Sequence, residues 1–397
     1  MKYKELLEKY KNGLASEEEK QIIEQEIEKY EAIEEYLSDN IDDEFNILTA
    51  LPESKNNEET IKLKKSVNSR LRKIVFMSVS IVIALVIGIF FLLSPLVDSF
   101  YYNPLKVTVG EIEKDINLDL YAITELNMPG FAFSYAHVEK LGFGKYEISY
   151  SLRKIFTDEH SGVTSVIKRG REFSKRKESN FYTKQHMLMT PLEFDTINPE
   201  GFEEQKQRVI NHINLLNPVS YVSAGLSFEK DLTMEELYEL EIKYPNIKFI
   251  WAGIRTSPSG TEIRNIIGIQ LINSNNVTIF DELVEDKYPA FQIWEWLVNP
   301  VGSGKSNKPI EAQSYELHYK SLLKYLIDRK DAVTALEVRP YKYDFYKSSL
   351  SYAEENGVKT YGVIVNSEAQ DLIKLIENEE LKLVEINQVL ASKGYIN

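Results

Sequence analysis

The stretch IVFMSVSIVIALVIGIFFLLSPLV, residues 74–97, decides the architecture of this chain, because its 24 residues include no charge. As an α-helix it would be about 36 Å long, whereas a bilayer's hydrocarbon core is about 30 Å thick. A buried helix of a soluble core rarely runs this far without a polar face. A cleavable signal peptide would lie nearer the N-terminus and have a shorter apolar region. The sequence therefore predicts one transmembrane helix.

Charge is distributed unevenly around this stretch. The 397-residue chain has a net charge of −14, of which −11 falls on residues 1–60, where 18 acidic residues outnumber 7 basic ones. Residues 61–73 carry six cations and no acid, and the remaining −9 is spread over residues 98–397. The positively charged flank of a membrane helix normally stays in the cytoplasm. The expected localisation is therefore the cell membrane, single-pass, with the N-terminus cytoplasmic and the C-terminal domain extracytoplasmic.

Composition excludes several classes of protein. A chain with 43% hydrophobic and 27% charged residues is ordinary for a globular protein, which argues against general disorder and against a multi-span transporter. The chain has no cysteine, so it is not a disulfide scaffold. Its acidic total disfavours a protein built to hold nucleic acid, and no direct nucleic-acid partner is expected.

Residues 1–52 are predicted to form a small acidic helical domain. Residues 3–12 carry an apolar stripe at helical spacing, Gly13 is placed to end that helix, and Ser16 with Glu19 forms a capping box that begins a second one. Two or three short helices bury little core by themselves, so this domain is either a solvated acidic hairpin or a module completed by a partner protein. Candidate contact residues, shared between internal core and interface, are Leu6, Leu7, Tyr10, Ile22, Ile23, Ile27 and Tyr30.

The region after the membrane helix has the pattern of an α+β fold. Alternation of apolar and polar residues, for example from Tyr146 to Leu152, predicts half-buried antiparallel strands. A helix is expected from Asn198 to about Leu216, and strands then alternate with helices in two β-α-β units. Thr233 and Glu236 form a second predicted capping box. The expected strands cover 219–228, 248–254, 263–272, 360–365 and 381–386, and the expected helices cover 233–243, 311–329, 342–355 and a segment capped by Ser367 and Gln370.

The fold class expected for the whole chain is thus α+β, with a short cytoplasmic helical arm, one transmembrane helix, an extracytoplasmic β-rich layer and an α+β domain with β-α-β units. The expected domains are 1–52, the acidic helical domain; 53–73, a basic tether; 74–97, the transmembrane helix; 98–197, the β-rich segment; and 198–397, the α+β domain.

Patterns that resemble catalytic sites have simpler explanations. Asn299–Ser306 resembles a phosphate-binding loop, but Asn299 stands where that motif needs its first glycine. The five histidines lie far apart, without metal-ligand spacing, and no nucleophile motif is present. We therefore predict no catalytic residue, no metal and no cofactor, and we do not expect an enzyme.

Two surface features have alternative interpretations. The basic run Lys168–Lys177 is either a solvated hairpin tip or a contact with anionic lipid or wall polymer. Trp294 and Trp296 flank Glu295 and are either one packed and one exposed residue of a strand, or part of a glycan-binding surface.

Several stretches resemble a known group of regulators. The run from Tyr10 to Glu19, followed by a helix, is similar to the anti-sigma domain of membrane-bound anti-sigma factors. Residues 222–237, 247–253 and 361–365 resemble the sigma-factor-regulator C-terminal domain of a Gram-positive anti-sigma group, and residues 68–160 resemble its N-terminal regulator segment. Many anti-sigma domains bind zinc through a His-x3-Cys-x2-Cys motif. Its ligand positions fall here on Glu26, Tyr30 and Ile33, so a zinc-free version is expected.

This resemblance implies a single-pass membrane anti-sigma factor. Its cytoplasmic helices would sequester an extracytoplasmic-function sigma factor, and its extracytoplasmic domain would modulate release, through regulated proteolysis or through altered association with a second membrane protein. Membrane lipid is a further expected partner, and a second membrane protein or wall polymer is an open one. The alternative is a membrane-anchored cell-envelope binding protein whose outer domain binds wall polymer or a protein partner.

Overall fold

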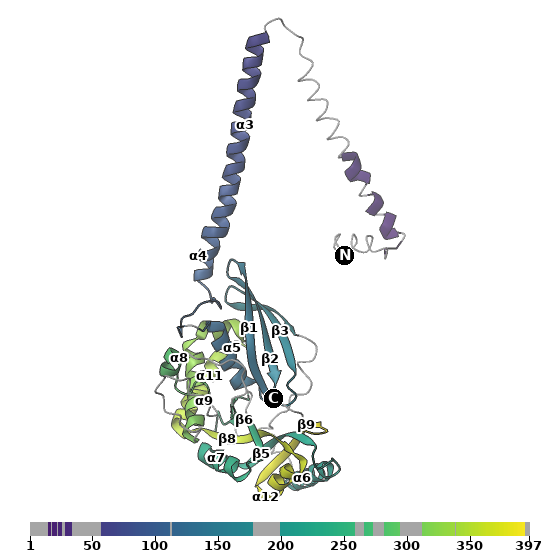
Figure 1. The fold of residues 1–397 in the computed structure, drawn as a ribbon, viewed down its shortest axis with the longest axis vertical. Helices are drawn as coiled ribbons and strands as arrows, with labels where there is room; N and C mark the ends of the chain where they lie inside the picture. Colours follow the sequence, from purple (N-terminus) through teal and green to yellow (C-terminus); the bar gives the residue numbers. More distant parts are fainter. Residues whose placement is uncertain are drawn as a thin grey trace. The chain divides into compact units, whose positions relative to one another are not determined.

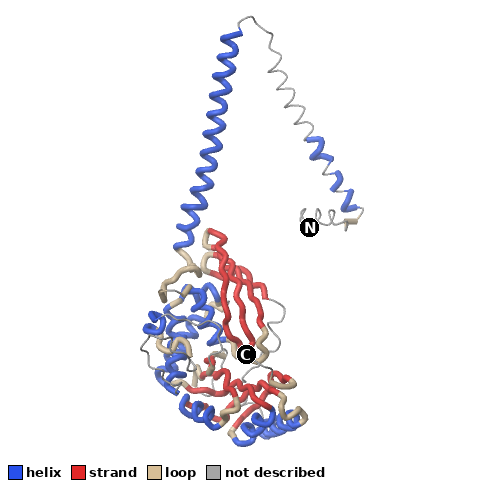
Figure 2. Tube along the Cα trace, viewed as in Figure 1, coloured by secondary structure: helices blue, strands red, loops and turns tan. Residues whose placement is uncertain are grey.

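A computed structural model of the chain is shown in Figures 1 and 2. It describes residues 15–16, 18–21, 23–25, 28–33, 57–111, 113–177, 199–258, 266–272, 282–293, 312–337 and 339–393. The chain divides into two units, Met1–Ala84 and Leu85–Asn397, and each is treated by itself below.

A long helix carries the apolar stretch. Helix α3 covers Asn57–Gly88, a π-helical turn η1 covers Ile89–Leu93, and helix α4 covers Ser94–Ser99. Within the described residues, the segment Lys62–Ser99 is the one helix that is long and apolar enough to cross a membrane, and its most apolar window is not buried inside the protein. The predicted span 74–97 lies wholly inside this helix. A core helix of a soluble domain would be covered by other elements, and this one is not.

The first sheet is antiparallel and follows chain order. Its strands pair β1-β2-β3-β4, and their alternating burial pattern is that of a sheet with one covered face. The predicted β-rich layer is therefore confirmed for the strands β1 (Phe131–Gly142), β2 (Lys145–Lys154), β3 (His160–Lys168) and β4 (Arg171–Lys177).

Helix α5, Asp115–Asn127, was not expected inside this β-rich segment. Its first turns place apolar residues at Ile116, Leu118 and Leu120, which reads as strand alternation. The helix is buried on nearly every side, because it packs between strand β1, strand β7 and helix α9. A helix buried on all sides has no polar face, so its helical period is hidden in the sequence.

The second sheet has strand order β7-β6-β8-β5-β9, and every neighbouring pair is antiparallel. Helix α7 connects strands β5 and β6, and in the sheet β8 lies between these two strands. Helix α12 connects β8 and β9, and in the sheet β5 lies between those two. The two β-α-β units predicted from sequence are thus confirmed, and they interlock in the split arrangement of ferredoxin-like folds. The strands are β5 (Tyr221–Thr233), β6 (Lys248–Ile254), β7 (Gly268–Gln270), β8 (Lys359–Glu368) and β9 (Leu381–Leu390).

Helices α6, α7, α9 and α12 pack against strands of the second sheet, whereas α10 contacts strand β4 of the first sheet and α11 packs on α9. Figure 2 shows helices and strands in this region. Helices α8 and α10 were not expected, and the others match the predicted segments within a few residues. The helices are α6 (Pro199–Asn214), α7 (Met234–Lys243), α8 (Glu282–Lys287), α9 (Ala312–Asp328), α10 (Lys330–Leu336), α11 (Lys342–Asn356) and α12 (Ala369–Asn378).

Of the two predicted caps in this region, one is present and one is not. The Thr233 hydroxyl accepts a hydrogen bond from the Glu236 N–H at 3.2 Å, and the Glu236 carboxylate accepts one from the Thr233 N–H at 2.7 Å. The expected cap by Ser367 and Gln370 is wrong. Ser367 is still part of strand β8 and fully buried, and its hydroxyl donates to the Glu368 carbonyl oxygen at 3.0 Å, so Glu368 is the N-cap residue instead.

Both sheets contribute to one hydrophobic cluster. Trp251 of β6 is fully buried, and its indole N–H donates to the carbonyl oxygen of Glu125 in α5 at 3.0 Å. Gly268 of β7 lets the two strands approach, since a Cβ there would lie 1.9 Å from the Ala252 carbonyl oxygen. The boundary predicted at residue 198 stays a prediction, and residues on both sides of it share this core.

Candidate functional site at the end of the membrane helix

The apolar helix ends in two polar residues that are buried against a hairpin. The Asp98 carboxylate accepts a hydrogen bond from the Gly144 N–H at 2.6 Å, and its other oxygen lies 2.6 Å from the Lys140 ammonium. One turn earlier, the Ser94 hydroxyl accepts from the Phe143 N–H at 3.0 Å. The side chain of Asp98 is only 5% exposed, so its charge is matched by these donors rather than by water. We call Ser94, Asp98, Lys140, Phe143 and Gly144 the joint.

The hairpin tip in the joint has an unusual backbone. Phe143 and Gly144 form the two-residue loop between β1 and β2, with φ of 54° and 71°. Two successive positive φ values indicate a type I′ turn, in which the first position is normally Asn, Asp or Gly. A bulky aromatic residue at positive φ is an outlier, and such strain often marks functional positions. Phe143 is held there by the Ser94 hydrogen bond and by an edge-to-face contact with Phe90, at 6.1 Å between ring centroids.

The tip of the second hairpin meets the same place. Arg169 and Gly170, between β3 and β4, repeat the conformation with φ of 52° and 70°. The Arg169 N–H donates to the Gly144 carbonyl oxygen at 2.7 Å, which joins the two turns. A Cβ on Gly144 would lie 3.1 Å from the Tyr101 ring. The end of the membrane helix and both hairpin tips therefore fit together closely, as Figure 1 shows for α4 and β1.

A buried ion cluster lies just beyond the joint. Arg329, after helix α9, binds Asp119 of α5 through two nitrogens, at 3.0 and 2.9 Å, and lies 3.0 Å from Asp115. The hydroxyls of Tyr102 and Tyr325 each donate to Asp119 at 2.7 Å. This cluster ties Tyr102, which is three residues beyond α4, to α5 and α9.

Burial and pairing act in opposite directions on the two charged groups of this cluster. Burial raises the pKa of Asp119, and the hydrogen bonds and charge of Arg329 act against that shift. Burial lowers the pKa of Arg329, but the hydrogen bonds and charge of Asp119 outweigh it and raise the pKa overall. Burial also raises the pKa of Tyr102 and Tyr325, which therefore remain proton donors. Removal of one partner from a buried ion pair leaves an uncompensated charge and destabilises the fold. We therefore interpret this cluster as structural rather than reactive.

Comparison with known protein families identifies the region that contains Arg329. Residues 213–388 match the family model described as sigma factor regulator C-terminal. This region is a sigma factor regulator C-terminal domain. We call residues 213–388 the regulator domain from here on. The match confirms, over this region, the recognition made from sequence. Neither the curated proteins nor the solved structures include a match to the chain.

The regulator domain contains the second sheet almost entirely. It runs from the end of α6 to β9, and it includes α9 together with Tyr325 and Arg329 of the ion cluster. The joint lies outside it, in α4 and the tip of the hairpin β1–β2. The ion cluster links the regulator domain to α5 and to Tyr102, which follows α4 in the chain.

The candidate contact residues of the N-terminal domain are only partly described. Ile23 is fully buried and Tyr30 is 69% exposed. The predicted capping box before them is present, since the Glu19 N–H donates to the Ser16 hydroxyl at 3.2 Å and the Ser16 N–H donates to Glu19 at 3.0 Å. Five candidates lie outside the described residues, namely Leu6, Leu7, Tyr10, Ile22 and Ile27. The assignment of these residues to a partner interface stays a prediction.

Other sequence signals have mixed outcomes. Lys168–Lys177 does form part of a hairpin, with its tip at Arg169 and Gly170. Trp294, Trp296 and Asn299–Ser306 lie outside the described residues. Among the residues that the structure does describe, no group of three or more His, Cys, Asp or Glu side chains could hold a metal ion.

Sequence reasoning missed the joint and the ion cluster. Phe143-Gly144 between two alternating stretches is a hairpin signal, and Asp98 is the first charge after the apolar run, so part of the joint was open to inference. The pairing of Arg329 with Asp119 could not be inferred from the sequence, because 210 residues separate them.

Proposed function

We propose that this chain is a single-pass membrane anti-sigma factor. Its N-terminal helices bind an extracytoplasmic-function sigma factor in the cytoplasm, and the regulator domain on the other side of the membrane controls that binding. The observation that carries this proposal is the regulator domain at residues 213–388, which follows a membrane-length helix with six cations on its N-terminal flank. The flank supports the cytoplasmic assignment of the N-terminal helices.

The described part of the N-terminal domain supports partner binding. Tyr30 and Ile33 stand one helical turn apart and are 69% and 55% exposed. Large apolar side chains that share one face of an acidic helix suit a partner with apolar residues surrounded by basic ones. Binding alone is sufficient for inhibition, because a sigma factor held at the membrane cannot present the same surface to RNA polymerase.

The joint and the ion cluster supply a route for control. A ligand or partner that shifts the first sheet moves the β1–β2 tip, which contacts the end of the membrane helix through Asp98 and Ser94, and the β3–β4 tip, which is bonded to the first tip. A change in the regulator domain reaches the same segment through Arg329 and Asp119. Such contacts transmit a signal only if the helix end has two arrangements with different stability. The strained backbone at Phe143 is the place where we expect a second arrangement to begin.

Binding of a purified extracytoplasmic-function sigma factor to the full-length chain in nanodiscs tests the interface. Ile33→Asp should weaken binding by at least tenfold, because it places a charge where an apolar contact is expected. Ile242→Asp is the matched control, since Ile242 is 62% exposed on α7 of the regulator domain and should not affect binding. Equal affinity of the Ile33→Asp chain and the unchanged chain would remove Ile33 from the interface. Absence of sigma-factor binding by the unchanged chain would favour the envelope-binding alternative.

A further inference from the structure

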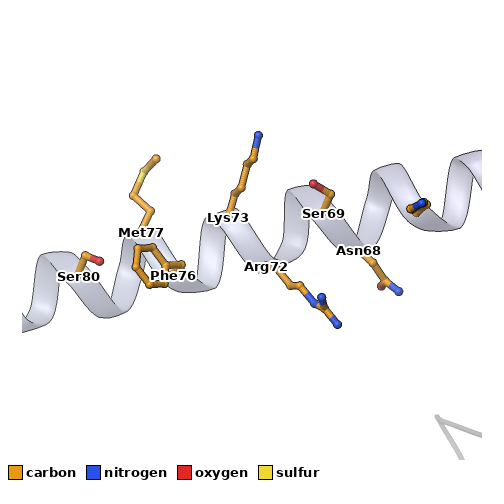
Figure 3. A pocket seen from close by; sticks show the side chains of 8 residues that line it. Asn68, Ser69, Arg72, Lys73, Phe76, Met77 and Ser80 are labelled. Carbon is orange, nitrogen blue, oxygen red and sulfur yellow. The ribbon is translucent and has the colours of Figure 1, made fainter.

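One face of helix α3 carries basic residues first and apolar residues after them. Figure 3 shows the side chains of this face on successive turns of the helix, within the unit Met1–Ala84. They follow a spacing of three and four residues, so they stack along one side. This basic face consists of Lys65, Asn68, Ser69, Arg72, Lys73, Phe76, Met77 and Ser80.

The order of these residues along the axis matches the layers of a membrane surface. Lys65, Arg72 and Lys73 come first, with the amide and hydroxyl donors of Asn68 and Ser69 between them. The uncharged span begins at residue 74, and the next side chains on the face are apolar. Cations and neutral donors followed by apolar groups are complementary to a phosphate-bearing headgroup joined to acyl chains.

The depth of each cation follows from helix geometry. At about 1.5 Å per residue, Arg72 and Lys73 lie within about 3 Å of residue 74, and Lys65 lies about 13 Å from it. A headgroup layer is about 5–8 Å thick on each side of the hydrocarbon core. Arg72 and Lys73 therefore lie at headgroup level. Lys65 lies beyond that layer, at a distance from its outer edge shorter than about one Debye length, so its charge still acts on the headgroups.

The opposite side of the same helix segment is different. Leu63, Val67, Leu71 and Ile74 are spaced at four, four and three residues and are all more than half exposed. Lys64, the immediate neighbour of Lys65, is not part of the basic face. Three of the six cations of residues 61–73, namely Lys65, Arg72 and Lys73, lie on the basic face, and the other three do not. The side opposite the basic face carries an apolar row, so the two sides of this helix segment differ.

We propose that the basic face binds the headgroup of an anionic phospholipid, with Arg72 and Lys73 on the phosphate and Phe76 and Met77 beside the acyl chains. The apolar pair directly above the cations favours a lipid over free phosphate. Binding at this depth holds the start of the membrane helix at a fixed height, so the lipid composition of that leaflet influences the position of the helix. The assignment to the cytoplasmic leaflet rests on the proposed function, whereas the binding itself does not.

Lipid selectivity of the full-length chain tests this proposal without a sigma factor. The chain is placed in vesicles of phosphatidylcholine, and electron paramagnetic resonance compares its association with spin-labelled phosphatidylglycerol and spin-labelled phosphatidylcholine. We expect the anionic lipid to be preferred, with each of Lys65→Gln, Arg72→Gln and Lys73→Gln lowering that preference by up to about fivefold. Lys64→Gln is the matched control and should preserve it. Lys65→Arg with Lys73→Arg should also preserve it, which separates lost charge from misfolding.

Other outcomes would overturn the proposal. If both spin-labelled lipids associate equally with the unchanged chain, the basic face is not a binding site for anionic lipid. An equal loss in Lys64→Gln and Lys65→Gln assigns the preference to diffuse charge rather than to the basic face. Displacement of the spin-labelled lipid by glycerol phosphate as readily as by unlabelled phosphatidylglycerol assigns the face to a free phosphate ligand. If the chain prefers phosphatidylglycerol only after residues 2–56 are deleted, the acidic N-terminal segment, and not a lipid, occupies the basic face in the intact chain.

Discussion

Substitution of Asp98 should separate the two contacts that hold the membrane helix at the joint. Asp98→Ala leaves the Gly144 N–H buried without an acceptor, which costs about 1–3 kcal/mol. It also removes the pairing with Lys140, but that ammonium is 43% exposed, so this loss adds at most about 1 kcal/mol. Asp98→Asn keeps an oxygen that can accept from Gly144 and loses only the ion pair. Asp98→Ala should therefore destabilise the hairpin tip by about 1–3 kcal/mol more than Asp98→Asn, because both variants lose the ion pair and only Asp98→Ala loses the acceptor.

Hydrogen exchange measures this difference directly. The full-length chain in nanodiscs is exchanged and analysed at single-residue resolution over residues 139–147. A difference of about 1–3 kcal/mol corresponds to about 5–150-fold faster exchange of the Gly144 amide in Asp98→Ala than in Asp98→Asn. Strand β6, Lys248–Ile254, serves as the internal control and should keep its protection in both variants. Equal exchange at Gly144 in the two variants would refute the reasoning, because the hydrogen bond would then contribute nothing to the tip.

Three further substitutions test the ion cluster and the second sheet. Arg329→Met should lower the free energy of unfolding by about 3–5 kcal/mol, because it leaves Asp119 buried without its main partner, and a loss below about 1 kcal/mol in denaturant melts would contradict this. Gly268→Ala should lower the melting temperature, because its Cβ would lie 1.9 Å from a backbone oxygen of β6, and an unchanged melting temperature would show that this close approach is absent. Thr233→Ala should cost about 1 kcal/mol at neutral pH through loss of the cap. The Thr233 backbone N–H, which this substitution keeps, and the Thr233 hydroxyl both lower the pKa of Glu236 below its ordinary 4.5. Only the hydroxyl's contribution to Glu236 is lost, so the difference between the unchanged chain and Thr233→Ala should shrink in part as the pH falls below 4.5, and a difference that grows as the pH falls would contradict this.

The elements that could be predicted are those whose signals are local. The apolar span is visible because no charge interrupts it, and the boundaries of β6 and α7 follow from Pro245 and from the Thr233 cap. Strand order in the second sheet is not local, since β5 and β8 pair across more than a hundred residues. Helix α5 was hidden because its burial on all sides removes the helical period.

The candidate site shows the same limit. The two glycine-containing turns of the first sheet, at Gly144 and Gly170, were recognisable as hairpin signals. The contact of the first turn with Asp98, and of the second turn with the first, depends on how the sheet packs against the end of the helix, which no spacing in the sequence reveals. The contact residues of the N-terminal domain rest on periodicity and on the resemblance, so they remain predictions.

Capture of a sigma factor is the most direct test of the central claim. The full-length chain and a chain lacking residues 2–56 are expressed in cells with a tagged extracytoplasmic-function sigma factor, and the membrane-bound sigma factor and the transcripts of its regulon are measured together. The account predicts that the full-length chain holds the sigma factor at the membrane and represses the regulon, and that the shortened chain does neither. Equal capture and equal repression by the two chains would contradict it.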